Sequence, residues 1–165
     1  MKLPEDIAAL ANETIAALKA ANLTVATAES CTGGLIAGAL TSVSGSSDVV
    51  YGGFVTYANE AKIAMVGVPF GLLREFGAVS KQVAMAMADG ALATAGTHLA
   101  VAVTGVAGPD GGTSEKPVGL VHFSLASADG TTHIRKQFKG LDRDGVRHAS
   151  VVQALQMLLK AAKAE

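Results

Sequence analysis

The sequence predicts an α/β fold, a three-layer α/β/α sandwich around a mixed, largely parallel sheet, in a single domain over residues 1–165. Three observations predict it. Short apolar runs alternate with segments of helical periodicity over the first two thirds of the chain, as in parallel sheets covered on both faces. Two later alternating runs around a turn predict an antiparallel hairpin. A length of 165 residues is close to the usual size of one domain.

The first half of the chain predicts helices and strands in alternation. Apolar residues recur at three- and four-residue spacing near the start, with acidic residues in the first turn, which is typical of an amphipathic helix. Later runs of strand length are apolar or rich in β-branched and aromatic residues. The predicted elements are a helix over 4–21, a strand over 23–28, a helix over 32–43, a strand over 49–57, and a helix from the N-cap Asn59 to about Val66.

The second half predicts a third parallel strand, a glycine-dense loop and the hairpin. The loop over residues 105–112 follows a strand directly and contains too many glycines for regular structure. The predicted elements are a short helix over 71–76, a helix capped by Ser80 that ends near Ala95, strands over 98–104, 118–127 and 131–139, and a final helix capped by Asp142.

Composition restricts the class of protein. Half of the residues are hydrophobic and only 16% are charged, which excludes a disordered chain. The most apolar stretch, residues 83–106, is interrupted by Asp89, Gly90, Gly96 and His98, so it predicts no membrane span. The net charge is −1 and the basic residues are scattered, so the sequence predicts no basic patch that would bind nucleic acid or an anionic membrane. We therefore expect a small-molecule partner.

Cysteine and histidine usage excludes further classes of site. One cysteine, Cys31, permits neither a disulfide framework within the chain nor a cysteine-rich zinc site. The four histidines are isolated from one another, so we expect no protein-held metal. The opening MKLPED lacks the apolar core of a signal peptide, and we expect a cytoplasmic protein.

Three strand ends carry polar or glycine-rich sequence, and these ends predict the site. They are residues 28–34, 56–62 and 104–112. Ligands of open α/β sheets bind beyond the carboxyl ends of parallel strands, so we expect the three segments to meet at one rim. Ser30 lies at a strand-to-helix turn, where free N–H groups stabilise an oxyanion or a phosphate. A plain helix N-cap is the alternative for this serine.

A serine nucleophile needs a base, and Lys62 is the candidate. In the first turn of a helix a cation is disfavoured, which lowers the lysine pKa and favours a neutral amine. A solvated surface lysine is the alternative. Tyr57 ends the preceding strand, so its phenol and the Lys62 amine can converge, although a strand tyrosine more often packs on its sheet. Cys31 is a rival nucleophile with no evident histidine partner.

Five segments together resemble the C-terminal domain family of the competence-damage protein CinA, in order and at the family's spacing. They are TAESCTGG at 27–34, GFVTYANEAK at 53–62, GAVS at 77–80, TGVAGPDGG at 104–112 and EKPVG at 115–119. The resemblance implies an α/β/α sandwich that hydrolyses the carboxamide of nicotinamide mononucleotide to nicotinate mononucleotide and ammonia, in pyridine-nucleotide salvage. It also implies a homo-oligomer and no cofactor. The pyrophosphatase activity associated with the larger N-terminal domain of full-length CinA is not carried over.

The family's catalytic serine, tyrosine and lysine fall on Ser30, Tyr57 and Lys62. We expect Ser30 to attack the amide carbon while neutral Lys62, assisted by Tyr57, takes its proton. Two other classes stay open, a nucleotide-binding module without catalysis and an amidase for another small carboxamide.

The expected binding groups surround these three residues. Candidates for oxyanion or substrate binding through backbone N–H groups are Cys31, Thr32, Gly33, Gly34, Thr104 and Gly105. Candidates for the phosphate are Gly108, Gly111, Gly112, Arg143 and Arg147, the two arginines being ordinary surface charges otherwise. Glu29 either faces the pyridinium ring or is the partner of a helix end.

Overall fold

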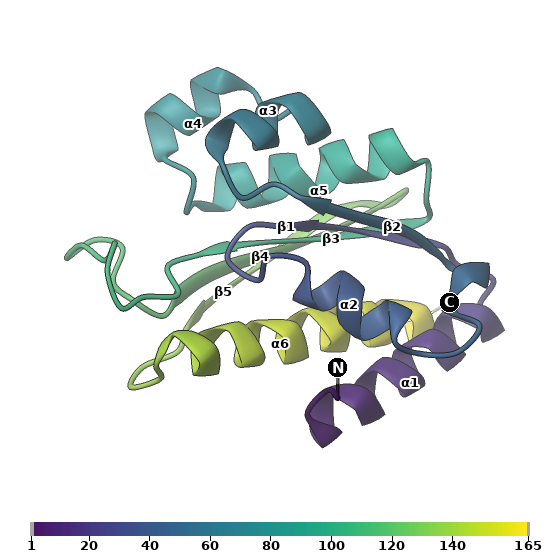
Figure 1. Ribbon diagram of the computed structural model, residues 1–165. Helices are drawn as coiled ribbons and strands as arrows, with labels where there is room; N and C mark the ends of the chain where they lie inside the picture. Colours follow the sequence, from purple (N-terminus) through teal and green to yellow (C-terminus); the bar gives the residue numbers. More distant parts are fainter. Residues whose placement is uncertain (1, 165) are drawn as a thin grey trace.

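A five-stranded sheet divides the structure, a computed structural model that describes residues 2–164, into two helical layers (Figure 1). One layer contains α1 (Glu5–Ala20), α2 (Leu35–Thr41) and α6 (Arg143–Ala164). The other contains α3 (Asn59–Val66), α4 (Phe70–Phe76) and α5 (Lys81–Ala95). The predicted three-layer sandwich is confirmed. Among the described helices, none combines the length and the hydrophobicity that a bilayer crossing needs.

The sheet is mixed, with strand order β2-β1-β3-β4-β5. Its strands are β1 (Val25–Glu29), β2 (Val50–Val55), β3 (Leu99–Gly105), β4 (Leu120–Ser127) and β5 (Gly130–Gln137). β1 pairs in parallel with both β2 and β3, as the alternation of strands and helices predicts. β4 is antiparallel to β3 and to β5, which confirms the hairpin.

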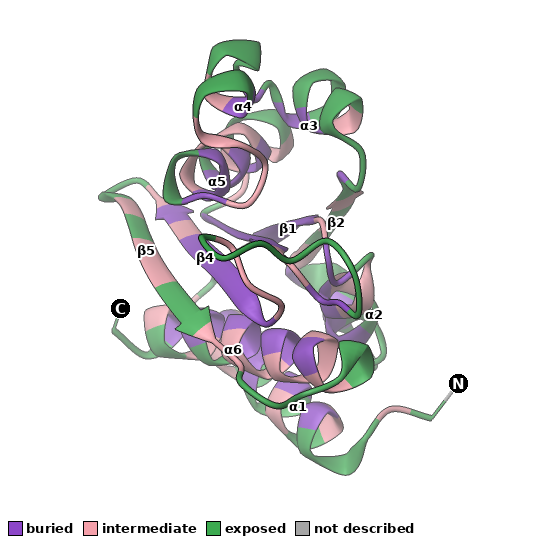
Figure 2. Cartoon of the chain, turned by 90° about the vertical axis from the view of Figure 1, so that its left-hand side faces the viewer, coloured by how far each residue is buried: buried purple, intermediate pink, exposed green. Residues whose placement is uncertain are grey.

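Small residues on the middle strands bring α5 close to the sheet. Ala28, Ala100 and Ala102 pack in the core under α5, where that helix presents Ala88 and Ala91. Larger side chains, among them the fully buried Phe123, fill the opposite core under α1 and α6. Figure 2 shows β4 buried between the two helical layers and much of the edge strand β5 exposed. The alanine content of the sequence therefore permits close packing on one face.

The largest departure from the predicted elements is the start of α2. The sequence predicts this helix from Thr32, but it begins at Leu35. Gly33 and Gly34 have φ values of +59° and +98°, which lie outside the right-handed helical region. The chain therefore makes a left-handed turn between β1 and α2, and Ser30 lies in a loop rather than at a helix cap.

Three predicted helix caps have different outcomes. Ser80 Oγ accepts from the N–H of Val83 at 3.3 Å, which confirms it as the cap of α5. Asp142 Oδ1 accepts from the N–H of Gly145 at 2.8 Å and caps α6. Asn59, however, is the first residue of α3 and Ala58 is its N-cap, so the cap prediction for Asn59 is wrong.

Candidate active site

The carboxyl ends of β1, β2 and β3 meet at one rim, as predicted. The last residue of β1, Glu29, lies beside Val55 of β2 and beside Val103 of β3. The chain continues the pairing past the strands, because the N–H of Ser30 donates to the carbonyl of Val103 at 3.0 Å and that of Thr56 donates to Glu29 at 2.8 Å. Ser30 is therefore held between two neighbouring strand ends.

The amine of Lys62 lies against Ser30. Lys62 is only 1% exposed. Its Nζ lies 3.1 Å from Ser30 Oγ, 2.8 Å from the carbonyl of Thr56 and 3.3 Å from that of Tyr57. A neutral amine has two hydrogens and one lone pair, so the two carbonyls can take both hydrogens and leave the lone pair for the Ser30 hydroxyl. This is the geometry of a general base and a nucleophile.

Burial lowers the pKa of Lys62 below its ordinary value, because the ammonium form loses its hydration. The alternative of a solvated surface lysine does not fit this position. The N-cap alternative for Ser30 does not fit either, since no backbone N–H among residues 2–164 donates to its hydroxyl.

Glu29 is the partner of a helix end. Its fully buried carboxylate accepts from the N–H groups of Gly34, Ile36 and Ala37 at 2.8 to 3.1 Å, and from the hydroxyl of Thr27 at 3.1 Å. A carboxylate at a helix N-terminus also meets the positive end of the helix dipole. These four donors occupy both oxygens, and they anchor the loop over residues 30–34, which we call the serine loop.

The N–H groups of the serine loop are not equally available. Gly33 donates to the carbonyl of Ser30 and Gly34 donates to Glu29. The N–H groups of Cys31 and Thr32 donate to no other residue within the described range 2–164. The hydroxyl of Thr32 is buried and has no hydrogen-bond partner within the same range. Of the four predicted oxyanion donors in this loop, the first two are therefore free to bind substrate.

Cys31 is unsuited to be the nucleophile. Burial raises the pKa of its thiol to about 12, so at neutral pH it carries its proton. Its side chain belongs to the core under α1 and α6.

The Tyr57 phenol meets Arg143 rather than Lys62. The side chain of Tyr57 is exposed, and its hydroxyl accepts from Arg143 Nη2 at 3.2 Å. Nη1 of the same guanidinium donates to the carbonyl of Gly108 at 2.7 Å. The hydrogen bond from Lys62 goes to the backbone carbonyl of Tyr57, and among residues 2–164 no hydrogen bond joins its amine to the phenol. Arg143 thus joins the end of β2 to the glycine-rich loop, a link that sequence reasoning missed.

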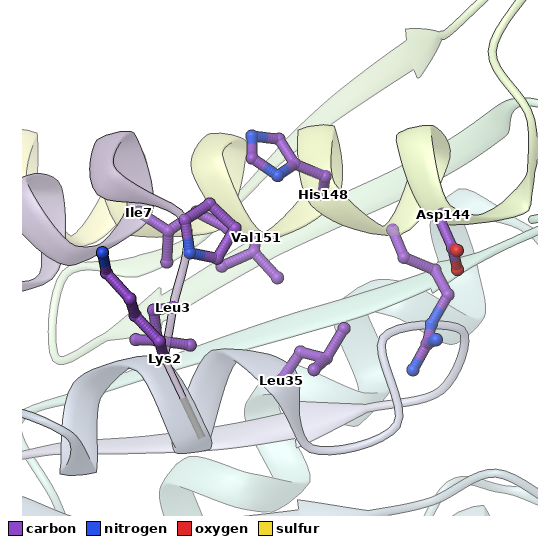
Figure 3. Close-up of a pocket in the computed structure, with 9 residues that line it drawn as sticks. Lys2, Leu3, Ile7, Leu35, Asp144, His148 and Val151 are labelled. Atoms are coloured by element: carbon purple, nitrogen blue, oxygen red, sulfur yellow. The ribbon is translucent and has the colours of Figure 1, made fainter.

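Arg147, one turn further along α6, holds the serine loop. Its Nε donates to the carbonyl of Cys31 at 3.2 Å and its Nη2 to that of Thr32 at 3.3 Å. It also borders a cavity of about 250 Å³ between the start of the chain, α2 and α6, whose apolar wall includes Ile7 and Leu35 (Figure 3). Ser30 does not line this cavity.

The remaining candidates shape the rim. Thr104 is buried and its hydroxyl donates to the carbonyl of Ala78 at 2.9 Å. Gly105 pairs with Val121 at the end of β3. Gly108 and Gly111 have φ values of +83° and +85°, and a Cβ at Gly108 or Gly112 would press on Val118. Within residues 2–164, no three His, Cys, Asp or Glu side chains gather as metal ligands would.

Some proteins similar to this chain are about as long as it is, and others are about three times longer. The Escherichia coli K12 protein named nicotinamide-nucleotide amidohydrolase PncC is 51% identical over 142 residues, which are 86% of each chain. A CinA-like protein of Synechococcus sp. RCC307 is 50% identical over 150 residues, which are 90% of this chain but 36% of that one. The chain thus spans about a third of the length of the CinA-like relatives it matches.

A solved structure and a family profile agree with these likenesses. The structure titled competence/damage inducible protein CihA from Agrobacterium tumefaciens superposes with a TM-score of 0.94 at 51% identity, covering 97% of this chain and 98% of that one. The profile described as CinA C-terminal domain matches residues 7–162. The chain therefore belongs to the CinA C-terminal domain family.

Proposed function

We propose that the protein is a nicotinamide-nucleotide amidohydrolase, which converts nicotinamide mononucleotide and water to nicotinate mononucleotide and ammonia. The observation that carries the proposal is the buried Lys62 amine against the Ser30 hydroxyl. Support for the substrate comes from relatives named for this activity that are about as long as this chain, including the one at 51% identity.

In the first step, neutral Lys62 takes the proton of Ser30 as Oγ attacks the amide carbon. The carbonyl of Thr56 and that of Tyr57 orient the amine, so its lone pair is directed at the hydroxyl. The tetrahedral intermediate carries a negative oxygen, for which the free N–H groups of Cys31 and Thr32 are the donors.

In the second step, the intermediate collapses and the carbon–nitrogen bond breaks. Protonated Lys62 gives its proton to the departing nitrogen, which leaves as ammonia, and an ester of Ser30 remains. Water then attacks this ester with Lys62 again as base, and the proton returns to Ser30 Oγ as the acid is released. One water enters and one ammonia leaves, so the reaction balances without any other reactant.

We propose that the substrate's phosphoribosyl end binds at the side of the rim near α6. The guanidinium groups of Arg143 and Arg147 use two N–H groups each for the hydrogen bonds described above, and the others remain for phosphate oxygens. The glycine-rich loop reaches the same place at Gly108, whose carbonyl accepts from Arg143, and Gly111 and Gly112 follow it in the loop. A proton-relay role for the Tyr57 phenol is tested by Tyr57→Phe.

Ammonia release tests the proposal. Nicotinamide mononucleotide, nicotinamide and the dinucleotide are offered to the wild type, Ser30→Ala, Lys62→Met and the exposed control Lys160→Met. We expect release from the mononucleotide, a fall of at least about a thousandfold in kcat for the first two variants, and no change for the control. Undiminished hydrolysis by Ser30→Ala would exclude it as the nucleophile.

The same assay separates the other two classes. A binding module without catalysis releases no ammonia from any of the three compounds, although the mononucleotide binds. An amidase for another carboxamide prefers a substrate without the phosphate, and Arg143→Gln then leaves its kcat/KM unchanged.

A further inference from the structure

A group of basic side chains gathers at the start of α5, and we call it the basic cluster. Side chains alternate along β4, and Phe123 packs under α6 while Ala126 packs under α5, so His122 faces α5. In the register of the hairpin, Arg135 lies directly opposite His122. The basic cluster consists of Lys81, Lys116, His122, His133 and Arg135.

The segment over residues 76–81 brings the two lysines of the cluster to this part of the sheet. Thr104, which is paired with His122 in the sheet, donates its hydroxyl to the carbonyl of Ala78. Lys116 Nζ donates to the carbonyl of Phe76 at 2.5 Å. Lys81 is the first residue of α5, immediately after this segment. The segment therefore passes over the pair formed by Thr104 and His122. Lys116 is hydrogen bonded to its first residue, and Lys81 is its last.

The two histidines are bonded to each other. His122 Nδ1 lies 2.9 Å from His133 Nε2, and the two rings stack with centroids 5.1 Å apart. His122 is 8% exposed, whereas His133 is half-buried. Burial, aided by His133, Arg135 and Lys116, lowers the pKa of His122 to about 4. Burial and the Lys81 ammonium lower the pKa of His133.

The positive charge of the basic cluster is not balanced within the described residues 2–164. Lys81, Lys116 and Arg135 form no ion pair there, and no carboxylate is among the causes of either histidine pKa shift. Asp89, two turns along α5, is hydrogen bonded to the Thr131 hydroxyl. Lys81 also stands at the N-terminus of α5, where the helix dipole disfavours a cation. The positive charges of Lys81, Lys116 and Arg135 repel one another, and a bound anion would reduce this repulsion.

We propose that the basic cluster binds a phosphate group, either inorganic phosphate or the phosphoryl group of a nucleotide. Lys81 and Arg135 are exposed cationic donors on two different elements, and the half-buried His133 lies two residues before Arg135, on the same face of β5. Donors that approach from several sides suit the tetrahedral oxygens of a phosphate dianion. Within residues 2–164, none of the five side chains of the basic cluster is hydrogen bonded to Ser30 or Lys62. The proposal does not rest on the proposed amidase activity.

The imidazole signals of His122 and His133 report this binding directly. In nuclear magnetic resonance titrations of the full chain, inorganic phosphate is compared with chloride at matched ionic strength. We expect saturable shifts of both signals and a raised pKa of His133 in the presence of phosphate, because the anion stabilises the imidazolium. Absence of a phosphate-specific, saturable shift would overturn the proposal.

Two neighbouring residues of β5 provide a matched pair of variants. Arg135 and Lys136 are both exposed, but Lys136 lies opposite Val121, which packs in the other core, so it is on the opposite face of the sheet. Arg135→Gln should weaken phosphate binding about tenfold, and Lys136→Gln should not. Lys81→Gln, at another exposed position, should repeat the loss. Equal affinities for all three variants and the wild type would contradict the proposal.

The source of the phosphate group is distinguished by a second ligand. Adenosine monophosphate is titrated in the same way as inorganic phosphate, and the two dissociation constants are compared. Tighter binding of the nucleotide, lost in Arg135→Gln, assigns the site to a phosphoryl group of nucleotides. Tighter binding of inorganic phosphate, lost in the same variant, assigns it to the free ion.

Discussion

The buried lysine of the rim is held at a cost in stability. No carboxylate within residues 2–164 pairs with the Lys62 amine, so its ammonium form lies in a site that provides carbonyl and hydroxyl oxygens alone. Dehydration of an unpaired ammonium is unfavourable, and this is why its pKa falls. The arrangement suits a base, which must lose its proton before it can act.

The stability of the protein should therefore rise with pH through the alkaline range. Between the lowered pKa of Lys62 and its ordinary value of 10.5, the unfolded chain binds a proton there that the folded chain does not. The free energy of unfolding then increases with pH across that window. Urea denaturation from pH 7 to pH 11 should show this rise in the wild type and a weaker one in Lys62→Met. Parallel curves would contradict the lowered pKa.

Local sequence was sufficient to predict the pairing of Ser30 with Lys62, because both residues follow strand ends that parallel pairing brings to one edge. It was insufficient for Tyr57, whose phenol is bound by Arg143, a residue 86 positions away. The direction of a rim side chain depends on which distant charges reach it, and a single sequence does not contain that information.

At the scale of elements, the contact of Glu29 with the start of α2 positions the serine loop, and the contact of Gly90 with Val66 positions α3. The Glu29 carboxylate replaces the missing hydrogen-bond acceptors at the start of α2. On the other side of the sheet, a Cβ at Gly90 of α5 would overlap the carbonyl oxygen of Val66 at the end of α3. The depth at which Lys62 enters the rim therefore depends on a helix crossing that only glycine permits.

Replacing Glu29 with glutamine should loosen the serine loop. The amide keeps the shape but loses the charge and one acceptor, so the free energy of unfolding should fall by about 1–3 kcal/mol. Activity should fall with it, because the N–H groups of Cys31 and Thr32 lose their support. Urea denaturation and ammonia release measure the two effects. The exposed Glu60→Gln in the first turn of α3 is the control, and an equal, small effect of both variants would count against the anchor.

Replacing Gly90 with alanine should separate α3 from α5. The added methyl must displace the Val66 backbone, which costs about 1–3 kcal/mol of stability. Lys62, one turn earlier on α3, should move away from Ser30 and lower kcat. Gly71→Ala is the matched control, since that helical glycine has open space around it and alanine favours helices. A fully active Gly90→Ala variant would refute this account of the crossing.

At the scale of the whole molecule, the sequence was most informative about the layers. The alternation of strands with helices predicted the parallel strands, and the turn at Gly130 predicted the hairpin. It was least informative about the start of α2, because the left-handed turn at Gly33 and Gly34 interrupts a segment whose composition otherwise favours a helix. Residues at strand ends are easier to place from the sequence than the loops beside them, since the loops depend on contacts across the fold.

The folded chain should also lose stability in mild acid. Between about pH 4 and pH 6.5 the unfolded chain binds a proton at His122 that the folded chain does not, so the free energy of unfolding decreases as pH falls through this window. His122→Gln should flatten this part of the curve relative to the wild type. Denaturation in phosphate-free buffer measures it. The same slope in both proteins would show that His122 titrates alike in the folded and unfolded chains.

Cys31 makes the serine loop accessible to a kinetic measurement. It is the sole cysteine of the chain, it is buried, and its thiol keeps its proton at neutral pH with a pKa of about 12. A thiol reagent can therefore react only when this loop opens. The rate of Cys31 labelling measures how often it opens, by local fluctuation or by global unfolding. Because the reporter adjoins Ser30, a bound substrate that orders the loop should protect the thiol, and occupancy of the rim can be followed without turnover.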